Sequence, residues 1–87
     1  MYYVYCIVTA KGDLYVGYTK DLNRRIAEHN SGMSKSTKGK QWKLAYYEAY
    51  LAEEDARRRE RKLKQRGQAK RFLKDRMRES MQAAMLS

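Results

Sequence analysis

The apolar residues near the start of the chain fall into two short runs that predict β-strands. Residues 2–9 and 14–19 are rich in β-branched and aromatic side chains, which suit a pleated, half-buried surface. Between them, Ala10-Lys11-Gly12-Asp13 provides a turn in which Gly12 can adopt a positive φ. The pattern predicts a β-hairpin. Because both faces of these strands are apolar, we expect at least one strand to be covered on both sides.

The length of the hairpin loop decides where two of the tyrosines point. Side chains alternate between the two faces of a sheet. A loop of two or four residues would place Tyr5 and Tyr15 on opposite faces, whereas a three-residue loop at residues 10–12 would place them on the same face. We predict the three-residue loop, with Gly12 in the left-handed conformation and both tyrosines on one face.

A helix is predicted after the hairpin. Thr19 or Asp21 can cap its start near Leu22, and Asn30-Ser31-Gly32 ends it. The following residues, 31–41, are polar and basic, which predicts a loop.

The pattern then predicts a third strand and two more helices. In the strand, at residues 42–50, Leu44, Tyr46 and Glu48 should share one face and Ala45, Tyr47 and Ala49 the other. The next helix starts with the acidic residues 53–55, which suit its dipole, and Gly67 follows as a helix breaker. A last helix begins near Gln68, with an apolar stripe made of Ala69, Phe72, Leu73, Met77, Met81, Ala84 and Met85.

With 87 residues the chain has room for one small core. We expect one domain at residues 1–75, with one sheet and a layer of helices, and a helical extension at residues 76–87 that either frays or binds a partner. The single cysteine, Cys6, excludes a cysteine-based zinc site and an internal disulfide framework, and its apolar neighbours predict a buried, inert thiol. The absence of a long apolar run or a signal-peptide pattern favours a cytoplasmic protein without a membrane span.

The net charge of +10 is concentrated in one segment. Residues 57–78 hold twelve Lys or Arg against two acidic residues, which accounts for the whole surplus. Such a segment indicates a polyanionic partner, most often nucleic acid, although a helix face that is merely solvated is the alternative. A membrane surface fits less well, because the segment lacks an aromatic or leucine-rich face.

The second predicted helix carries an acidic residue on its inward side. Its only apolar side chains are Ala56 and Leu63, and Glu60 falls on the same stripe. Two interpretations stay open. Glu60 pairs with Arg57 or Lys64, an interaction worth roughly 0.3–0.5 kcal/mol, or it is a ligand for a hard divalent cation such as Mg²⁺.

Arg25 and His29 lie on the same side of the first helix as Leu22 and Ile26. Arg25 can extend its charged end from an apolar edge or present its guanidinium group to a phosphate. A lone histidine on a helix is more often structural than catalytic. The tyrosines are poor bases unless cations or a metal stabilise the phenolate, because the reference pKa of a phenol is about 10.

The order of these residues resembles that of the GIY-YIG nuclease superfamily. The first motif reads Tyr3-Val4-Tyr5 and the second reads Tyr15-Val16-Gly17. Arg25 and His29 stand at the spacing of that family's arginine and histidine. Glu60 lies in the helix after the third strand, where the family carries its metal-binding glutamate.

The resemblance covers about residues 2–73 and includes three segments similar to small stand-alone bacterial members: Glu28-His29-Asn30-Ser31-Gly32, Ser36-Thr37-Lys38 and Tyr46-Tyr47-Glu48. The first glycine of the family name is Tyr3 here, the isoleucines are valines, and an asparagine of many larger members has no counterpart. The resemblance implies an α+β fold, with a small three-stranded antiparallel sheet flanked by about three helices.

The resemblance also implies a metal-dependent DNA endonuclease with low sequence specificity and selectivity for DNA structure, as in DNA repair. Tyr5, with His29, would take or relay the proton of the attacking water, and Tyr15 would orient water or phosphate. Arg25 would stabilise charge on the phosphate, and Glu60 would hold one Mg²⁺ or Mn²⁺ ion. The residues expected to contact DNA are Gly17, Lys38, Arg57, Arg61, Lys64, Lys70 and Arg71.

Two other interpretations remain. The rival is a nucleic-acid-binding module that kept the fold without catalysis. The third is a module that binds a protein partner, or a second copy of itself, through Met77, Met81 and Met85. The complete set of two tyrosines, arginine, histidine and glutamate favours the enzyme.

Overall fold

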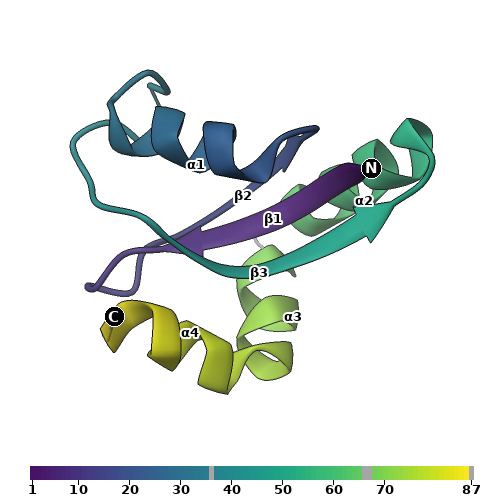
Figure 1. Ribbon diagram of the computed structural model, residues 1–87. Coiled ribbons are helices and arrows are strands. Elements are labelled where there is room, and N and C mark those ends of the chain that lie inside the picture. Colours follow the sequence, from purple (N-terminus) through teal and green to yellow (C-terminus); the bar gives the residue numbers. More distant parts are fainter. Residues whose placement is uncertain (36, 66–67, 87) are drawn as a thin grey trace.

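The fold is a three-stranded antiparallel sheet with helices on both faces (Figure 1). The computed structural model describes residues 1–35, 37–65 and 68–86, except for the side chains of residues 68–70 and 72. In chain order the elements are β1 (Tyr2–Val8), β2 (Leu14–Thr19), α1 (Leu22–Asn30), β3 (Lys43–Tyr50), α2 (Glu53–Lys64), α3 (Gln68–Arg76) and α4 (Arg78–Leu86). The predicted α+β class and the three antiparallel strands are confirmed.

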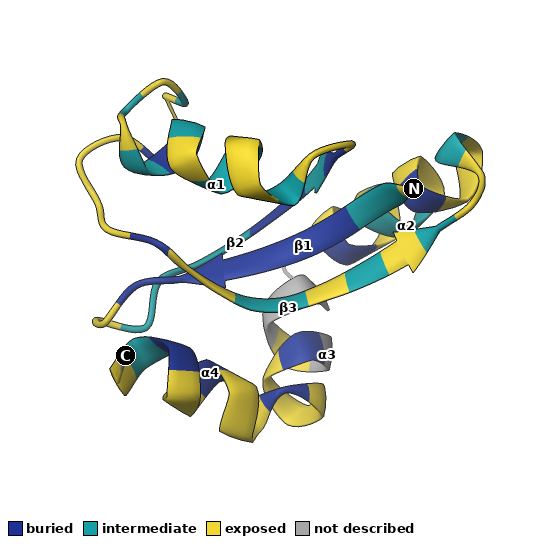
Figure 2. Cartoon of the chain, in the orientation of Figure 1, coloured by how far each residue is buried: buried dark blue, intermediate teal, exposed yellow. Residues whose placement is uncertain are grey.

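The central strand, β1, is covered on both sides. The strand order is β2-β1-β3. α1 lies over one face of the sheet, and α3 and α4 lie over the other (Figure 1). β1 is therefore buried from Val4 to Val8, whereas the edge strand β3 is mostly exposed or half-buried (Figure 2).

The hairpin loop has the predicted three residues. The backbone N–H of Thr9 donates to the carbonyl of Asp13 at 3.0 Å, and the N–H of Gly12 donates to the carbonyl of Thr9 at 3.0 Å. Gly12 has a φ of 91°, a conformation that glycine adopts without steric cost. The Thr9 hydroxyl also donates to the Asp13 carboxylate at 2.8 Å, which closes the loop from both strands.

This loop sets the register that brings two tyrosines to one face. Ile7 lies opposite Tyr15, and Tyr5 lies opposite Gly17. Directly paired residues share a face, and residues two apart on one strand do so as well. Tyr5 and Tyr15 therefore lie on the face covered by α1, as predicted.

Each face of the sheet has its own apolar cluster. Under α1, Tyr5 and Ile7 pack with Trp42, and the partly buried Leu22 and Ile26 of the helix complete the layer. On the other face the cluster is larger and contains Val4, Cys6, Val8, Val16, Ala56, Leu63, Leu73, Met77, Met81 and Ala84. As predicted, Cys6 is a buried free thiol.

β3 departs from the predicted alternation. Cys6 lies opposite Tyr46, but the next residue, Ile7, lies opposite Leu44, so the strand has an irregularity at Ala45. An extra residue in one strand interrupts the alternation of faces. Leu44 consequently lies on the α1 face and Tyr46 on the other face, and the prediction that the two share a face was wrong.

The first helix is capped as the sequence indicates. The Asp21 carboxylate accepts a hydrogen bond from the backbone N–H of Arg24 at 3.1 Å, which satisfies one of the free amides of the first turn. The helix ends at Asn30, and Gly32 follows with a φ of 82°. Of the two capping candidates, Asp21 fills the role, and the Thr19 hydroxyl donates to the carbonyl of Asp21.

The last predicted helix is two helices, α3 and α4, which meet at Met77. One straight helix over these residues would be roughly 28 Å long at 1.5 Å per residue, in a molecule with extents of 32 × 28 × 22 Å. The break lets Leu73 and Met81 both stay buried against the same sheet. The predicted breaker Gly67 and the side chains of Ala69 and Phe72 lie outside the described residues.

The methionine stripe is occupied by the protein's own core. Met77 is 2% exposed and Met81 is 9% exposed, and Met85 packs against them while partly buried. Met77 and Met81 are therefore core residues, whereas binding of a partner or a second copy through this stripe stays a prediction. The division of the chain at residue 75 stays a prediction. Among the described residues, no helix has both the length and the apolar composition that a membrane span requires.

Gly17 marks a close approach between two strands. The Tyr5 ring lies across Gly17 so tightly that a Cβ there would be 2.9 Å from Tyr5 Cε1 and closer still to the Cζ and hydroxyl end. Gly17 was expected to contact DNA, but the space where its side chain would lie is filled by the Tyr5 ring. Glycine at this position is required by packing.

We predict that Gly17→Ala destabilises the protein by about 1–3 kcal/mol, the usual cost of overpacking, because the new methyl group displaces the Tyr5 ring. Urea unfolding followed by circular dichroism measures this cost. The control is the same substitution in a Tyr5→Ala background, where most of the cost should disappear. An equal loss of stability in both backgrounds would show that the Tyr5 ring is not the cause.

Candidate active site

A hydrogen bond between Tyr5 and His29 forms the centre of the site. The Tyr5 hydroxyl lies 2.7 Å from His29 Nε2, and both side chains are almost completely buried. Tyr5 comes from β1 and His29 from the last turn of α1. The register of the hairpin and the packing of α1 on the sheet therefore combine to join these two groups.

The other nitrogen of His29 is held by Thr37. His29 Nδ1 lies 2.7 Å from Thr37 Oγ1, and Thr37 is fully buried. A neutral imidazole donates from one nitrogen and accepts at the other. If Nδ1 donates to Thr37, Nε2 accepts from Tyr5; in the other tautomer both roles are reversed. Each tautomer leaves both ring nitrogens satisfied.

Hydrogen bonds of Asn30 and Trp42 hold the loop that carries Thr37 in place. Asn30 Oδ1 accepts from the backbone N–H of Trp42 at 2.6 Å, and Asn30 Nδ2 donates to the carbonyl of Trp42 at 3.1 Å. The indole N–H of Trp42 donates to the carbonyl of Thr37 at 3.0 Å. The long connection between α1 and β3 is thereby tied at both ends, which fixes the Thr37 hydroxyl beside His29.

Thr37, Asn30 and Trp42 were not predicted as site residues. Thr37 lies in a polar stretch with several other hydroxyl residues, and its composition carries no signal that sets one hydroxyl apart. Only the distance between His29 and Thr37, eight residues apart in the chain, reveals the contact.

Burial keeps Tyr5 protonated. Loss of solvent raises the pKa of Tyr5 from 10.0 to about 12, against the opposing hydrogen bond and charge of Arg25. To act as a base, the phenol was expected to need cations or a metal that stabilise the phenolate. In the protein alone, the arginine does not offset the cost of burial, so Tyr5 is a neutral phenol at physiological pH.

His29 is also held in its neutral form. Burial lowers the pKa of His29 below its ordinary value of 6.5, and the positive charges of Arg25 and Lys64 lower it further, while Glu28 acts in the opposite direction. Arg25 itself pairs with Glu28 at 3.0 Å and is partly exposed. Because Arg25 also acts on Tyr5 through a hydrogen bond and its charge, the guanidinium group lies between the buried tyrosine and the solvent.

Tyr15 and Lys64 border the site on the β2 side. The Tyr15 ring meets the His29 ring edge-on, with centroids 5.1 Å apart, and the Lys64 ammonium lies 5.0 Å from the centroid of the Tyr15 ring. Such a position of a cation over an aromatic face is attractive. The contact connects α2 to the hairpin at the point where the tyrosines and histidine meet.

Glu60 lies on the side of α2 that faces these residues. Its carboxylate pairs with Lys64 at 3.2 Å, and its side chain is 19% exposed. Besides burial, the negative charge of Glu60 is one of the causes that raise the pKa of Tyr5. The ion pair with Lys64 is thus present, whereas Arg57 pairs with Glu53 instead. The role of Glu60 as a metal ligand stays a prediction.

The residues around Glu60 suit a metal ion that brings most of its own ligands. The described residues contain no group of three or more His, Cys, Asp or Glu side chains placed to enclose a metal. Mg²⁺ commonly uses one or two carboxylates together with water and substrate phosphates. A single accessible carboxylate beside an arginine and a lysine fits that mode of binding, in which phosphate oxygens complete the coordination.

The basic residues expected to contact DNA are distributed over two surfaces. Lys64 lies over Tyr15 and borders the site, whereas Arg57 lies over the Tyr18 ring at 4.3 Å, and Tyr18 belongs to the opposite face of the sheet. Lys38 and Arg61 are exposed. The side chain of Lys70 lies outside the described residues.

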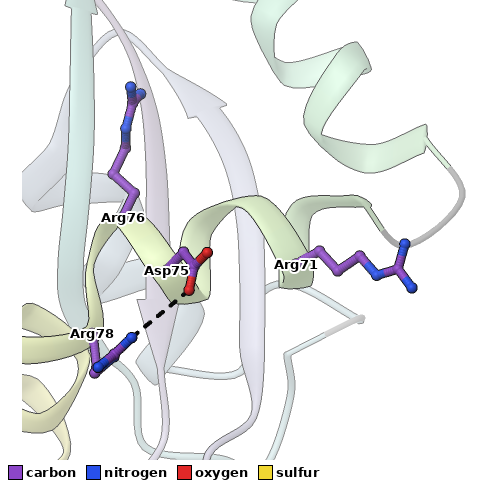
Figure 3. A pocket seen from close by; sticks show the side chains of 4 residues that line it. All are labelled: Arg71, Asp75, Arg76 and Arg78. Carbon is purple, nitrogen blue, oxygen red and sulfur yellow. Dashed lines mark ion pairs between the residues drawn. The ribbon is translucent and has the colours of Figure 1, made fainter.

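Arg71 lies on a second surface, where α3 meets α4. It lines a recess of about 660 Å³ with Asp75, Arg76 and Arg78. Figure 3 shows the three guanidinium groups pointing in different directions, with Arg78 turned toward Asp75 at 3.9 Å. Because the arginines do not converge, the recess is not a site for a single small anion.

Comparison with known proteins identifies relatives of this chain. Residues 1–74 match the family model of the GIY-YIG catalytic domain. A UPF0213 protein of Halobacterium salinarum is 41% identical over 71 residues, which cover 79% of this chain and 92% of that protein. A UPF0213 protein of Staphylococcus epidermidis is 38% identical over 65 residues, or 72% of this chain and 79% of that protein.

A solved structure is similar along the whole chain. The solution NMR structure of a UPF0213 protein from Bacillus halodurans has a TM-score of 0.58 and 32% sequence identity, and covers 100% of this chain and 98% of that one. The names of these relatives state no activity. The matched range, residues 1–74, spans the positions of both tyrosine motifs, Arg25, His29 and Glu60. The chain therefore belongs to the GIY-YIG nuclease family.

Proposed function

We propose that this protein is a metal-dependent endonuclease that hydrolyses phosphodiester bonds in DNA. The observation that supports the proposal best is the convergence of side chains from three elements on the hydroxyl of Tyr5, which β1 carries. His29 and Arg25 approach it from α1, Tyr15 lines its surroundings from β2, and Glu60 approaches from α2. A structural histidine alone would not require a partly exposed arginine and carboxylate beside it.

In the proposed reaction Tyr5 relays a proton. Its neutral hydroxyl accepts the proton of the attacking water as it passes its own proton to His29 Nε2, 2.7 Å away. This direction requires Nδ1 of His29 to donate to Thr37. The raised pKa of Tyr5 keeps the phenol neutral, which suits a relay in which it accepts one proton as it gives up another. The neutral imidazole of His29 is the group that finally takes up the proton.

Arg25, Glu60 and Tyr15 act on the phosphate side. Arg25 has a partly exposed guanidinium group, which can donate to two phosphate oxygens and stabilise the charge that grows there. Glu60 would hold one Mg²⁺ or Mn²⁺, which when bound supplies Lewis-acid stabilisation of the phosphate and the leaving oxygen. Tyr15 would orient the water or the phosphate from the β2 side.

DNA would be held mainly through its backbone. Lys38, Arg57, Arg61, Lys64 and Arg71 offer positive charge to the phosphates, and contacts to the backbone carry no sequence information, which suits low sequence specificity and selectivity for DNA structure. DNA repair is the pathway we propose. We also propose a cytoplasmic setting, in which reducing conditions keep the Cys6 thiol free; burial raises the pKa of this thiol to about 12.

The alternative function is a nucleic-acid-binding module without catalysis. It is favoured by the second basic surface at Arg71, Arg76 and Arg78, which lies apart from Tyr5 and Tyr15 and could hold a polyanion without cleaving it. The two functions predict different roles for Glu60. In the enzyme Glu60 holds the metal ion, whereas in a binding module a carboxylate next to a phosphate has no function.

We predict that Glu60→Gln lowers the rate of plasmid nicking in Mg²⁺ or Mn²⁺ by roughly 10²-fold or more, because the amide no longer holds the ion. DNA affinity should stay the same or rise, since a negative charge is removed. The matched control is Glu54→Gln, an exposed glutamate on the same helix, which should nick like the wild type. DNA binding without cleavage by the wild type and both variants would support the binding module instead.

We predict that the rate of nicking falls at acidic pH because His29 becomes protonated, which gives the pH–rate profile an acid limb. The pKa of His29 is lowered, so the neutral, proton-accepting form dominates down to below about pH 6.5. The rate should therefore stay constant near neutrality and fall only below that pH. His29→Gln should lose roughly 10²–10⁴-fold in rate and lose the limb. A limb centred above pH 7, or one that persists in the variant, would contradict this role.

A further inference from the structure

A second polar cluster lies on the face of the sheet opposite the candidate active site. Its centre is Glu48 of β3, whose side chain is only 15% exposed. Arg59 of α2 donates two hydrogen bonds to this carboxylate, from Nε at 2.9 Å and from Nη2 at 3.1 Å. The hydroxyls of Tyr46 and Tyr50 also donate to it, the former at 2.7 Å. The guanidinium of Arg76, from α3, lies 3.9 Å from the same carboxylate. We call Glu48, Arg59, Tyr46 and Tyr50 the Glu48 cluster.

The cluster holds Glu48 in its charged form. Burial works to raise the pKa of Glu48, but the hydrogen bonds from Arg59, Tyr50 and Tyr46 outweigh it and lower the pKa below its usual value. The paired geometry of a guanidinium and a carboxylate fixes both position and direction. A contact of this kind between residues eleven apart in the chain joins an edge strand to a helix in one orientation.

The helix that this cluster holds has few other means of orientation. Of the twelve residues of α2, only Ala56 and Leu63 are buried, and Ala52 at its start makes no capping hydrogen bond through a side chain. Two buried residues in line along a helix fix the distance between the helix and the sheet. They restrict rotation of the helix about its own axis much less. The rotation must come from polar contacts at the helix sides.

Such contacts occur on both sides of α2. On the β2 side, the Tyr18 hydroxyl donates to Glu53 at 2.7 Å. On the β3 side, Arg59 bonds to Glu48. Consecutive helix residues point about 100° apart. When Arg59 reaches toward β3, its neighbour Glu60 therefore points toward the β2 side, where Tyr15 and the hydroxyl of Tyr5 lie.

We propose that Glu48 is a positioning residue that sets the rotation of α2 and thereby holds the Glu60 carboxylate at the active site. This inference rests on the proposed function of Glu60. A rotation of α2 by about 20° would move a carboxylate roughly 6 Å from the helix axis by about 2 Å. Displacements of that size are enough to cost a reaction about 10²-fold in rate. In this proposal Glu48 contacts neither DNA nor metal, because its side chain lies on the opposite face of the sheet from Tyr5.

The test compares Glu48→Gln with Asp55→Asn. Asp55 pairs with Arg58 at 3.1 Å on the exposed side of the same helix, so the control also removes one acidic partner of an arginine on α2 but does not touch the sheet. Mn²⁺ alone is titrated into each protein without DNA, and free Mn²⁺ is followed by electron paramagnetic resonance. We expect about 10-fold weaker Mn²⁺ binding in Glu48→Gln and unchanged binding in Asp55→Asn.

Kinetics supply the second measurement. In Glu48→Gln, kcat for nicking should fall about 10-fold or more while KM for DNA stays within about twofold, because the DNA-contacting side chains are untouched. Arg59→Lys, which keeps the charge but loses the paired hydrogen bonds, should reproduce the effect in a milder form. It serves as the test variant if Glu48→Gln does not fold by circular dichroism.

The outcomes separate this inference from the proposed function. If the wild type neither binds Mn²⁺ at Glu60 nor cleaves DNA, the proposed function fails. If the wild type does both and the folded Glu48 and Arg59 variants match Asp55→Asn in Mn²⁺ affinity and kcat, the positioning role is overturned. A loss of thermal stability in the Glu48 variant with unchanged Mn²⁺ affinity would also overturn it, because a purely structural role predicts that result.

Discussion

The site depends on one steric constraint, the passage of the Tyr5 ring across Gly17. A side chain on β2 at this point would occupy the space of the ring, and the hydroxyl would not reach His29 at 2.7 Å. The pairing of Tyr5 with Gly17 depends in turn on the three-residue hairpin loop and the positive φ of Gly12. A local property of the turn is therefore transmitted through strand register to the position of one phenol oxygen.

Burial supplies the chemistry of the central pair. Removal of water favours the neutral forms of both groups, raising the pKa of Tyr5 and lowering that of His29. Arg25 acts on both groups in the direction expected of a nearby positive charge. In the proposed relay the Tyr5 phenol gives up one proton as it accepts another and so stays neutral, and the positive charge ends on the imidazole of His29.

Much of this arrangement was predictable because it follows from local rules. Period-two alternation and the turn residues predict the hairpin and its register, and the carboxylate at Asp21 caps the first helix. The contacts that join distant segments carry no such signal. The partnership of His29 with Thr37 and the irregularity at Ala45 depend on how a loop and an edge strand settle on the finished sheet. The break at Met77 likewise keeps Leu73 and Met81 buried against the sheet, which periodicity in the helix does not encode.

The central claim is that the hydroxyl of Tyr5, and not merely its ring, performs the chemistry. Tyr5→Phe keeps the ring over Gly17 and removes only the oxygen, so single-turnover nicking of DNA by this variant is the most direct test. The account predicts a loss of roughly 10²-fold or more in rate, with folding and DNA affinity preserved. Cleavage by the folded phenylalanine variant at the wild-type rate would contradict it.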